Sequence, residues 1–369
     1  MHASVSRKPE ARPTTAAPPA FAGSFDLPTR QSGAFRHPPI LNPQTVAECG
    51  EHALIARIRQ RLATPQWVVV GPGDDAAVIE PVRGALEVLT TDAQVDGVHF
   101  DRRFVPPDAI GHRALAVNLS DLAAMGARPR AALLSMALPP SFELEAFDRM
   151  VDGFLALAVR YGVALIGGNI THTSGPMVLD VTAIGNVHRR KMLTRDGARA
   201  GDEVFVTGTL GDAAAGLLRL QEDHSAADYA PRYLRPDPRV RAGTLLGRNR
   251  AATSCMDLSD GLADGVRQIA QASSVGMTLD ASSLPMGQDA KSWLSSKGRD
   301  PISVALSGGD DFELIFTARP RQAGRLRAVR RLLGDLPITK IGVVTRARRL
   351  LVKDERGERE LPDGYEHFR

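Results

Sequence analysis

The stretch EVFVTGTLGDAAAGLLRL, residues 203–220, places the pattern of a buried strand directly before the pattern of a helix. Its first six residues favour a strand, because valine, phenylalanine and threonine fit a pleated surface. Its last ten residues, GDAAAGLLRL, follow a glycine turn and repeat apolar side chains at helical spacing. A strand that turns at once into a helix is the building unit of α/β proteins, so we predict an α/β fold.

The same alternation continues on both sides of this stretch. Strands are predicted over residues 85–95 (entering a loop), 131–139, 163–169, 177–187, 252–259, 276–280, 310–318 and 339–344. Helices are predicted over residues 51–62, 107–129, 142–161, 239–249, 261–273 and 321–333. A charged, glycine-containing stretch, HRRKMLTRDGARAGD, interrupts the alternation after residue 187. We therefore predict two domains, residues 47–188 and 189–369, as expected for a chain of 369 residues.

The N-terminal segment differs in composition. Residues 1–46 contain eight prolines and little apolar periodicity, which is typical of a disordered tail. The alternative is a targeting peptide, but no long apolar stretch follows the basic residues of this segment. We therefore predict a disordered tail.

Composition excludes several classes of protein. No apolar run is long enough to span a membrane, and two cysteines are too few for a disulfide framework, which favours the cytoplasm. The pI is about 9.3, but residues 1–46 hold five basic and two acidic side chains and so contribute +3 of the net +4. Most basic residues are arginines in an alanine-rich chain, which we interpret as composition bias. Nucleic-acid binding is not expected.

Aspartates recur beside glycine or hydroxyl residues, which the pattern places at strand ends and loops. The clusters are GDD (Asp74, Asp75), TTD (Thr90, Thr91, Asp92), NLSD (Asp121), DLSDG (Asp257, Ser259, Asp260) and SGGDDFEL (Asp310, Asp311, Glu313). One such cluster is compatible with a helix cap or a turn. Five together favour Mg²⁺ and a phosphate ligand, because Mg²⁺ prefers carboxylates completed by water and phosphate.

A conventional phosphate-binding loop is absent from the sequence. No G-x-x-x-x-G-K-[ST] motif occurs, so metal ions and backbone N–H groups would have to neutralise a phosphate. Glycine loops at 167–169, 207–216 and 306–311 could supply such N–H groups, although each is equally compatible with an ordinary tight turn.

The order of these motifs resembles a known family. GPGDDAAVI, TTDAQVDGVHF, RALAVNLSDLAAMGARP, LIGGN, VTGTLGDAAAGL, MDLSDGL, SGGDDFEL and DGYEHF follow one another over residues 48–368. This series resembles the thiamine-monophosphate kinases, within the superfamily of aminoimidazole ribonucleotide synthetase. The resemblance implies a two-domain α/β (α+β) fold of that type, an N-terminal sheet domain that forms a homodimer, and ATP as co-substrate in the cleft. The implied reaction is Mg²⁺-dependent phosphorylation of thiamine monophosphate to thiamine diphosphate.

The resemblance also assigns roles to individual residues. The implied metal ligands are Asp74, Thr90, Thr91, Asp92, Asp121, Asp257 and Asp260, and four of them, Asp74, Asp92, Asp121 and Asp260, are the implied catalytic residues. ATP contacts are implied for Gly168, Asn169, Arg195 and Ser259, and contacts with the thiamine phosphate for His99, Asp310, Asp311, Glu313 and Tyr365. The structural alternatives are a solvated loop for His99, a surface ion pair for Arg195 and simple packing for Tyr365.

A general base is not required for this reaction. The second pKa of a phosphomonoester lies near 6, so the acceptor phosphate is largely ionised at neutral pH. The obstacle is repulsion between two anions, which positioning and charge neutralisation overcome.

One motif departs from the family pattern. The family usually has Gly-Gly-Asp followed by Thr-Thr-Arg, whereas this chain reads GGNITHTSGP, with Asn169 in place of the aspartate. Two alternatives to the kinase therefore remain. One is another ATP-using relative, such as an aminoimidazole ribonucleotide synthetase or a selenophosphate synthetase, although no reactive Cys or Lys motif precedes GPGDD. The other is a nucleotide-binding relative without turnover.

Overall fold

The computed structural model describes residues 44–363. Tyr365 and residues 1–43 of the predicted tail lie outside the described residues. The end of the predicted tail, residues 44–46, is part of the fold. The Thr45 side chain accepts a hydrogen bond from the Glu48 backbone at 3.3 Å, and the Glu48 carboxylate accepts one from the Gln44 backbone at 2.7 Å. This reciprocal capping starts a helix at Val46, so the segment outside the fold is shorter than predicted.

The first half of the described chain is built around a four-stranded sheet. Its elements are α1 (Val46–Cys49), α2 (Glu51–Arg59), β1 (Val68–Val70), β2 (Val78–Ile79), β3 (Leu86–Val95), α3 (Pro107–Ala124), β4 (Arg128–Leu138), α4 (Leu144–Tyr161), β5 (Ala164–His172) and β6 (Val178–Val187). The strand order is β3-β6-β4-β5, and only β4 and β5 are parallel. Helix α4 connects these two strands, as a parallel pair requires.

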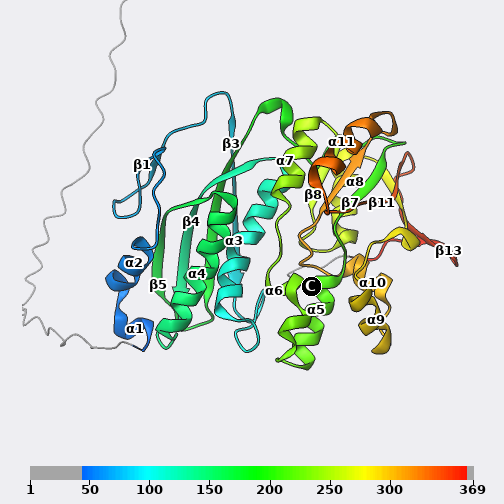
Figure 1. Cartoon of the computed structure of the whole chain (residues 1–369). Coiled ribbons are helices and arrows are strands. Elements are labelled where there is room, and N and C mark those ends of the chain that lie inside the picture. Colours follow the sequence, from blue (N-terminus) through cyan, green and yellow to red (C-terminus); the bar gives the residue numbers. More distant parts are fainter. Residues whose placement is uncertain (1–43, 364–369) are drawn as a thin grey trace, which may run out of the picture. The chain divides into compact units, whose positions relative to one another are not determined.

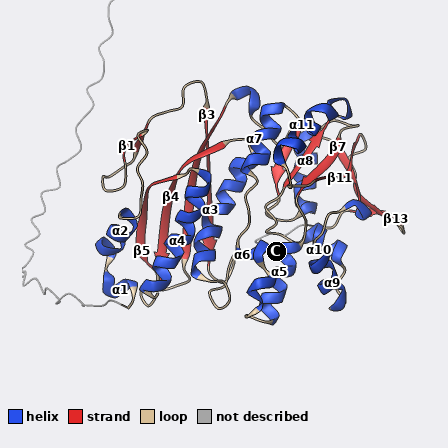
Figure 2. Cartoon of the chain, viewed as in Figure 1, coloured by secondary structure: helices blue, strands red, loops and turns tan. Residues whose placement is uncertain are grey.

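Helices α3 and α4 cover one face of this sheet (Figures 1 and 2). Side chains that alternate along β3 and β6 point either to these helices or to the opposite face. The opposite face is incompletely covered: α2 and the β1–β2 pair flank it, and Leu89 on β3 is 66% exposed there.

The second half contains a seven-stranded sheet. Its elements are η1 (Arg189–Lys191), β7 (Glu203–Thr207), α5 (Asp212–Glu222), η2 (Ala226–Tyr229), α6 (Pro231–Leu234), α7 (Val240–Asn249), β8 (Ser254–Asp257), α8 (Leu262–Ser273), β9 (Gly276–Asp280), η3 (Ala281–Ser283), α9 (Gln288–Ser296), α10 (Pro301–Ser307), β10 (Leu314–Ala318), η4 (Pro320–Gln322), α11 (Ala323–Leu333), β11 (Ile338–Thr345), β12 (Leu350–Asp354) and β13 (Gly357–Glu360). The strand order is β13-β12-β9-β11-β7-β10-β8, and only β12 and β9 are parallel.

Both faces of this larger sheet are covered. Phe205 and Phe316 stack at a centroid distance of 5.4 Å on the face that packs against α7 and α11. Val204 and Ile315 point the other way, into the cluster formed with α8. Burial on both faces explains why the strands at 203–207 and 314–318 read as nearly continuous apolar runs.

Helix α7 packs directly on α3 and so joins the two halves (Figure 1). The contact is so close that a Cβ at Gly243 would lie 1.9 Å from the Ala123 carbonyl oxygen. Any larger residue would force the helices apart. This packing brings the end of β8 beside the C-terminal part of α3, where the acidic motifs lie.

Most long elements predicted from the sequence are present, which confirms the mixed α/β architecture. The sequence analysis missed the β1–β2 pair, α9, α10 and the β12–β13 pair. Helix α10 had a readable signal, because Asp300 caps it through the backbone N–H groups of Ile302 and Ser303 and Pro301 is its first residue. The segment 85–95 is a strand throughout, so Thr90–Asp92 lie inside a strand rather than at its end.

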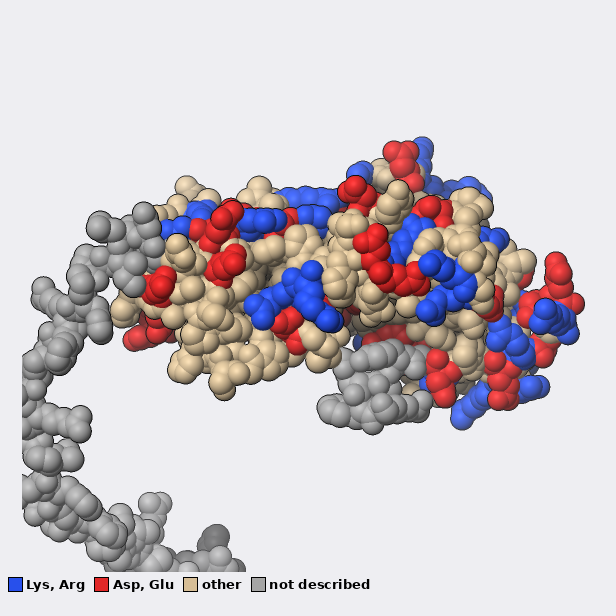
Figure 3. Space-filling model, turned by 90° about the horizontal axis from the view of Figure 1, so that it is seen from below, with Lys and Arg blue, Asp and Glu red and all other residues tan. Residues whose placement is uncertain are grey.

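Figure 3 shows basic and acidic side chains intermixed on the visible face. Among residues 44–363, no helix is long and apolar enough to cross a membrane.

Candidate functional site

Four predicted metal-binding residues meet between β3, α3 and β8. Thr90 donates a hydrogen bond to the Asp121 carboxylate, and the charges of Asp121 and Asp257 both act on Asp92. We call Thr90, Asp92, Asp121 and Asp257 the inner carboxylate cluster. Thr90 and Asp92 reach it because alternate side chains of β3 point toward α3. Asp121 lies in the last turn of α3, and Asp257 is the last residue of β8.

Ser120 links the two halves of the chain at this cluster. Its hydroxyl donates to Asp257 Oδ2 at 2.7 Å, and both residues are buried. Since Ser120 belongs to α3 and Asp257 to β8, this bond holds the cluster together across the contact between α3 and the second half.

The inner carboxylate cluster carries unfavourable negative charge. Burial, together with the charges of Asp121 and Asp257, raises the pKa of Asp92 to about 7. Burial and then Asp121 raise the pKa of Asp257 to about 7, while the Ser120 hydrogen bond and the more distant charge of Arg195 oppose that shift. A cation would relieve this repulsion. Within the described residues, however, no three His, Cys, Asp or Glu side chains are already arranged to hold one metal ion.

Thr91 lies on the opposite face of the sheet from Thr90 and Asp92. Its hydroxyl donates to Asp180 Oδ1 at 2.9 Å. The seven predicted metal ligands therefore do not form a single group. This separation follows from strand geometry, because three consecutive residues of a strand cannot all face one ion with their side chains.

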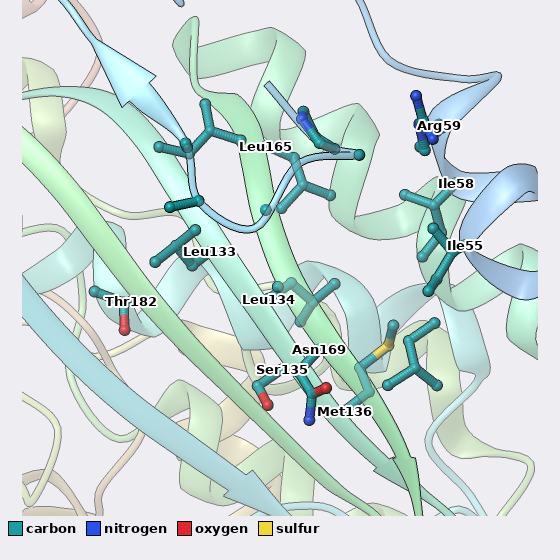
Figure 4. Close-up of a pocket in the computed structure, with 18 of the residues that line it drawn as sticks. Ile55, Ile58, Arg59, Leu133, Leu134, Ser135, Met136, Leu165, Asn169 and Thr182 are labelled. Carbon is teal, nitrogen blue, oxygen red and sulfur yellow. The ribbon is translucent and has the colours of Figure 1, made fainter. Parts of the chain in front are cut away.

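Thr91, Asp180, Asp74 and Asn169 line one cavity, which has a volume of about 880 Å³. We call it the outer-face cavity. Asp74 and Asp75 enter it from the loop between β1 and β2. Figure 4 shows Asn169 beside Ser135 on the neighbouring strand, with Ile55 and Ile58 of α2 across from them.

Two further features shape the outer-face cavity. Gly168 allows β5 to approach β4, because a Cβ at this position would lie 1.9 Å from the Leu134 carbonyl oxygen. The Arg59 guanidinium lies so close to Gly73 that a Cβ there would be 2.6 Å from its central carbon. Arg59 therefore supplies positive charge beside the GPGDD loop, a role that the sequence analysis missed.

The DLSDG and SGGDDFEL motifs lie side by side. The Asp310 backbone N–H donates to the Ser259 carbonyl at 2.7 Å, and the Phe312 N–H donates to Leu258 at 2.8 Å. The Ser259 hydroxyl also donates to Asp260 Oδ2 at 3.1 Å. Asp310 has a left-handed backbone with φ of 66°, which aspartate tolerates better than most residues. The predicted contacts of Ser259, Asp260 and Asp310 thus come from one loop pair.

Glu313 has a structural position, which contradicts its predicted contact with the substrate. Its carboxylate is fully buried and accepts hydrogen bonds from Thr207 at 2.7 Å, from Arg239 Nε at 2.6 Å and from Arg232. All of its hydrogen-bonding capacity is used inside the protein. The alternating pattern of the motif could not distinguish this position from that of Asp310.

Asp311 is also directed inward rather than toward a ligand. Both carboxylate oxygens accept from the Gly211 backbone N–H, at 3.0 and 2.8 Å, at the start of α5. Burial raises the pKa of Asp311 well above its usual value. The geometry supports a helix-capping role, so the predicted substrate contact of Asp311 is also contradicted.

His99 lies in the turn after β3. Its Nδ1 accepts a hydrogen bond from the Val95 N–H at 3.1 Å, so the neutral ring carries its proton on Nε2. Its carbonyl accepts from Arg113 and Tyr233, both at 3.3 Å. Arg195 is exposed and donates to Gln268 of α8.

The sequence analysis missed Ser120, Asp180, Arg59 and Arg113. Two of them had a readable signal: Ser120 directly precedes Asp121 in NLSD, and Asp180 is an acidic residue in an otherwise apolar strand. Arg59 and Arg113 had none, because each lies in a helix among residues of ordinary composition and reaches its neighbours only in the folded chain.

Comparisons with known proteins identify two matching domains. The AIR synthase related protein N-terminal domain matches residues 73–187, and the corresponding C-terminal domain matches residues 199–355. Among curated relatives, a thiamine-monophosphate kinase of Bacillus subtilis (strain 168) is 37% identical over 330 residues, which cover 86% of this chain and 99% of the relative. One of Escherichia coli (strain K12) is 39% identical over 331 residues, covering 87% and 98%.

Solved structures agree with these relatives. A thiamine-monophosphate kinase from Stenotrophomonas maltophilia K279a superposes with a TM-score of 0.74 at 41% identity, over 82% of this chain and 96% of that one. The structure of AaThiL complexed with AMPPCP and TMP has a TM-score of 0.69 at 34% identity, over 87% and 98% of the two chains.

Proposed function

The chain belongs to the thiamine-monophosphate kinase family of AIR synthase related proteins, and we propose that it transfers the γ-phosphoryl group of ATP to thiamine monophosphate. The product is thiamine diphosphate, so the enzyme is a phosphotransferase with a phosphate group as acceptor. The observation that carries this proposal is the similarity, over 98% of its length, to a protein that was solved with AMPPCP and TMP. AMPPCP is a non-hydrolysable analogue of ATP.

We further propose that Mg²⁺ is the required metal. The donor set fits this ion, since the inner carboxylate cluster and the outer-face cavity offer carboxylate, hydroxyl and amide oxygens. The raised pKa values of Asp92 and Asp257 are the structural sign that the cluster lacks a compensating charge. Bound Mg²⁺ would neutralise the phosphates and align them for in-line transfer.

The chain's own residues contribute positioning. Gly168, Asn169, Ser259 and Arg195 are proposed to contact ATP. Arg195 is suited to a phosphate or ribose contact, because it is exposed and its charge acts on Asp257 of the inner carboxylate cluster. We propose that Asp74, Thr91 and Asp260 add ligands from the flanking loops and the outer face.

We assign the acceptor side to His99 and Asp310. The Nε2 proton of His99 is suited to donate to a phosphate oxygen. We assign no residue as general base, because the acceptor phosphate is already largely ionised at neutral pH. Tyr365 is proposed as a further acceptor contact from the C-terminal motif.

We also propose that the protein is a cytoplasmic homodimer. The incompletely covered face of the β3-β6-β4-β5 sheet carries Leu89, Leu133 and Ile184 at exposed or half-buried positions. Pairing this face with a second copy would bury them. Cys49 and Cys255 are free thiols, which suits a reducing compartment.

A chromatographic assay tests the activity. We expect thiamine diphosphate to form from ATP and thiamine monophosphate when Mg²⁺ is present and not when EDTA replaces it. Consumption of ATP with aminoimidazole ribonucleotide precursors but not with thiamine monophosphate would identify another member of the superfamily. ATP binding without turnover of any acceptor would identify a non-catalytic relative.

Asn169→Asp tests the departure from the family motif. Asn169 shares the outer-face cavity with Asp74 and Asp180, so an aspartate should strengthen a metal site there. We expect the Mg²⁺ concentration for half-maximal rate to fall about tenfold, equivalent to about 1.4 kcal/mol. Ser135→Asp, on the neighbouring strand of the same cavity, is the matched control for added charge alone. Superimposable Mg²⁺ dependences with a lowered maximal rate in Asn169→Asp would contradict the expectation.

A further inference from the structure

Arg113 is a fully buried cation near the acceptor side of the site. It lies in the middle of α3, and its side chain is 1% exposed. Burial of a charged guanidinium is costly unless partners compensate it, so its contacts carry information about its role. Its Nε lacks a hydrogen-bond partner in the described structure, which shows that the side chain is not placed there for its own stability alone.

The contacts of Arg113 reach three separate segments. One terminal nitrogen donates to the Tyr233 carbonyl of α6. The other donates to the His99 carbonyl at 3.3 Å and lies 3.3 Å from Asp310 Oδ2. A single planar group thus connects the turn after β3, the short helix α6 and the loop before β10.

Tyr233 reinforces this arrangement. Its ring lies under the Arg113 guanidinium, with 4.4 Å between the guanidinium carbon and the ring centroid. Its hydroxyl donates to the same His99 carbonyl at 3.3 Å. The His99 carbonyl therefore receives two donors, one from each half of the chain.

His99 and Asp310 are the two residues that the proposed function places at the acceptor substrate. They come from different halves of the sequence, and of the contacts described here only Arg113 touches both. The Asp310 loop has a left-handed backbone, which depends on surrounding contacts to stay in place.

We propose that Arg113 is a positioning residue for the acceptor substrate: its guanidinium sets the position of His99 relative to Asp310 and thereby the affinity for thiamine monophosphate. This inference rests on the proposed function. Arginine is required because its planar fork can serve two acceptors in fixed directions while stacking on an aromatic ring, whereas a lysine ammonium cannot do so.

Arg219 provides a matched control. It is also a buried arginine, at 7% exposure, and pairs with Asp289 at 2.6 Å. It also stacks on aromatic rings, Tyr229 and Trp293, and its Nε also lacks a partner in the described structure. None of its contacts involves a proposed site residue, so it shares the chemistry of Arg113 without its connections.

The experiment compares Arg113→Lys and Arg219→Lys in the full-length chain. We expect both to lower the melting temperature. Only Arg113→Lys should raise KM for thiamine monophosphate, by about tenfold, with KM for ATP and kcat changed by less than about twofold. Equal KM values for thiamine monophosphate in both variants would overturn the inference, as would a parallel loss of affinity for ATP.

Tyr233→Phe keeps the inference testable if Arg113→Lys does not fold. It removes one of the two donors to the His99 carbonyl and retains the ring, and should raise KM for thiamine monophosphate by about threefold. An unchanged KM in a folded Tyr233→Phe would count against the inference. A wild-type protein that neither binds nor turns over thiamine monophosphate would overturn the proposed function as well, whereas normal wild-type turnover with unaltered variants would overturn the inference alone.

Discussion

Asp121→Asn is expected to reduce kcat/KM by about 10²–10³-fold, the range seen when one preorganised electrostatic group is removed from a site. Asp121 accepts the Thr90 hydrogen bond, and its charge raises the pKa of both Asp92 and Asp257. It is therefore central to the inner carboxylate cluster. The same substitution removes repulsion between buried carboxylates, so the metal-free variant should melt at a higher temperature than the wild type.

Thermal melts in EDTA and in excess Mg²⁺ check this pair of effects. In EDTA the variant should gain stability, and in Mg²⁺ that gain should shrink, because the wild type then binds the cation more strongly. Asp152→Asn is the control, since Asp152 is exposed on α4 and 3.5 Å from Arg61, far from any proposed ligand role. Equal loss of stability in both conditions would instead identify Asp121 as a structural residue.

The stability of the wild type in EDTA should also depend on pH. The folded pKa values of Asp92 and Asp257 are raised from 3.8 to about 7. For an acid with a raised folded pKa, the stabilising contribution is present below the unfolded pKa and is lost as pH rises through the folded pKa. Stability in EDTA should therefore fall between pH 4 and pH 7, and less steeply in Asp121→Asn.

Glu313→Gln is expected to destabilise the protein by about 3–5 kcal/mol, the cost of removing one partner from a buried ion pair. The Glu313 carboxylate is fully buried and serves Arg232, Arg239 and Thr207. An amide cannot balance two guanidinium groups, and one of its hydrogen-bonding positions becomes a donor facing them. At about 2–4 °C per kcal/mol for a domain of 150–250 residues, the melting temperature should fall by several degrees or more.

Glu222→Gln is the matched control for this prediction. Glu222 also forms an ion pair, with Lys297, but its side chain is 42% exposed. Such surface pairs contribute about 0–1 kcal/mol, so the control should melt close to the wild type. A stable Glu313→Gln with a raised KM for thiamine monophosphate would restore the direct substrate contact predicted from the sequence.

The sequence by itself determined the class of the fold and the chemistry of the site. Apolar periodicity predicted the long elements, such as the helix over residues 142–161 and the strand over 177–187, because burial of one face imposes a fixed spacing on the chain. The ordered aspartate motifs predicted a magnesium and phosphate enzyme, because few side chains other than carboxylates suit that ion. Short elements such as α9 and the β12–β13 pair were missed, since few residues carry their pattern.

Only the tertiary structure decided which of these residues act together. Thr90 and Thr91 are neighbours in the chain, yet one joins the inner carboxylate cluster and the other the outer-face cavity, because strand side chains alternate between faces. In the same way, Asp310 faces the proposed acceptor side while Glu313 is enclosed by two arginines. Whether a carboxylate binds a ligand or balances a buried charge depends on neighbours that are distant in sequence, and local composition carries no record of them.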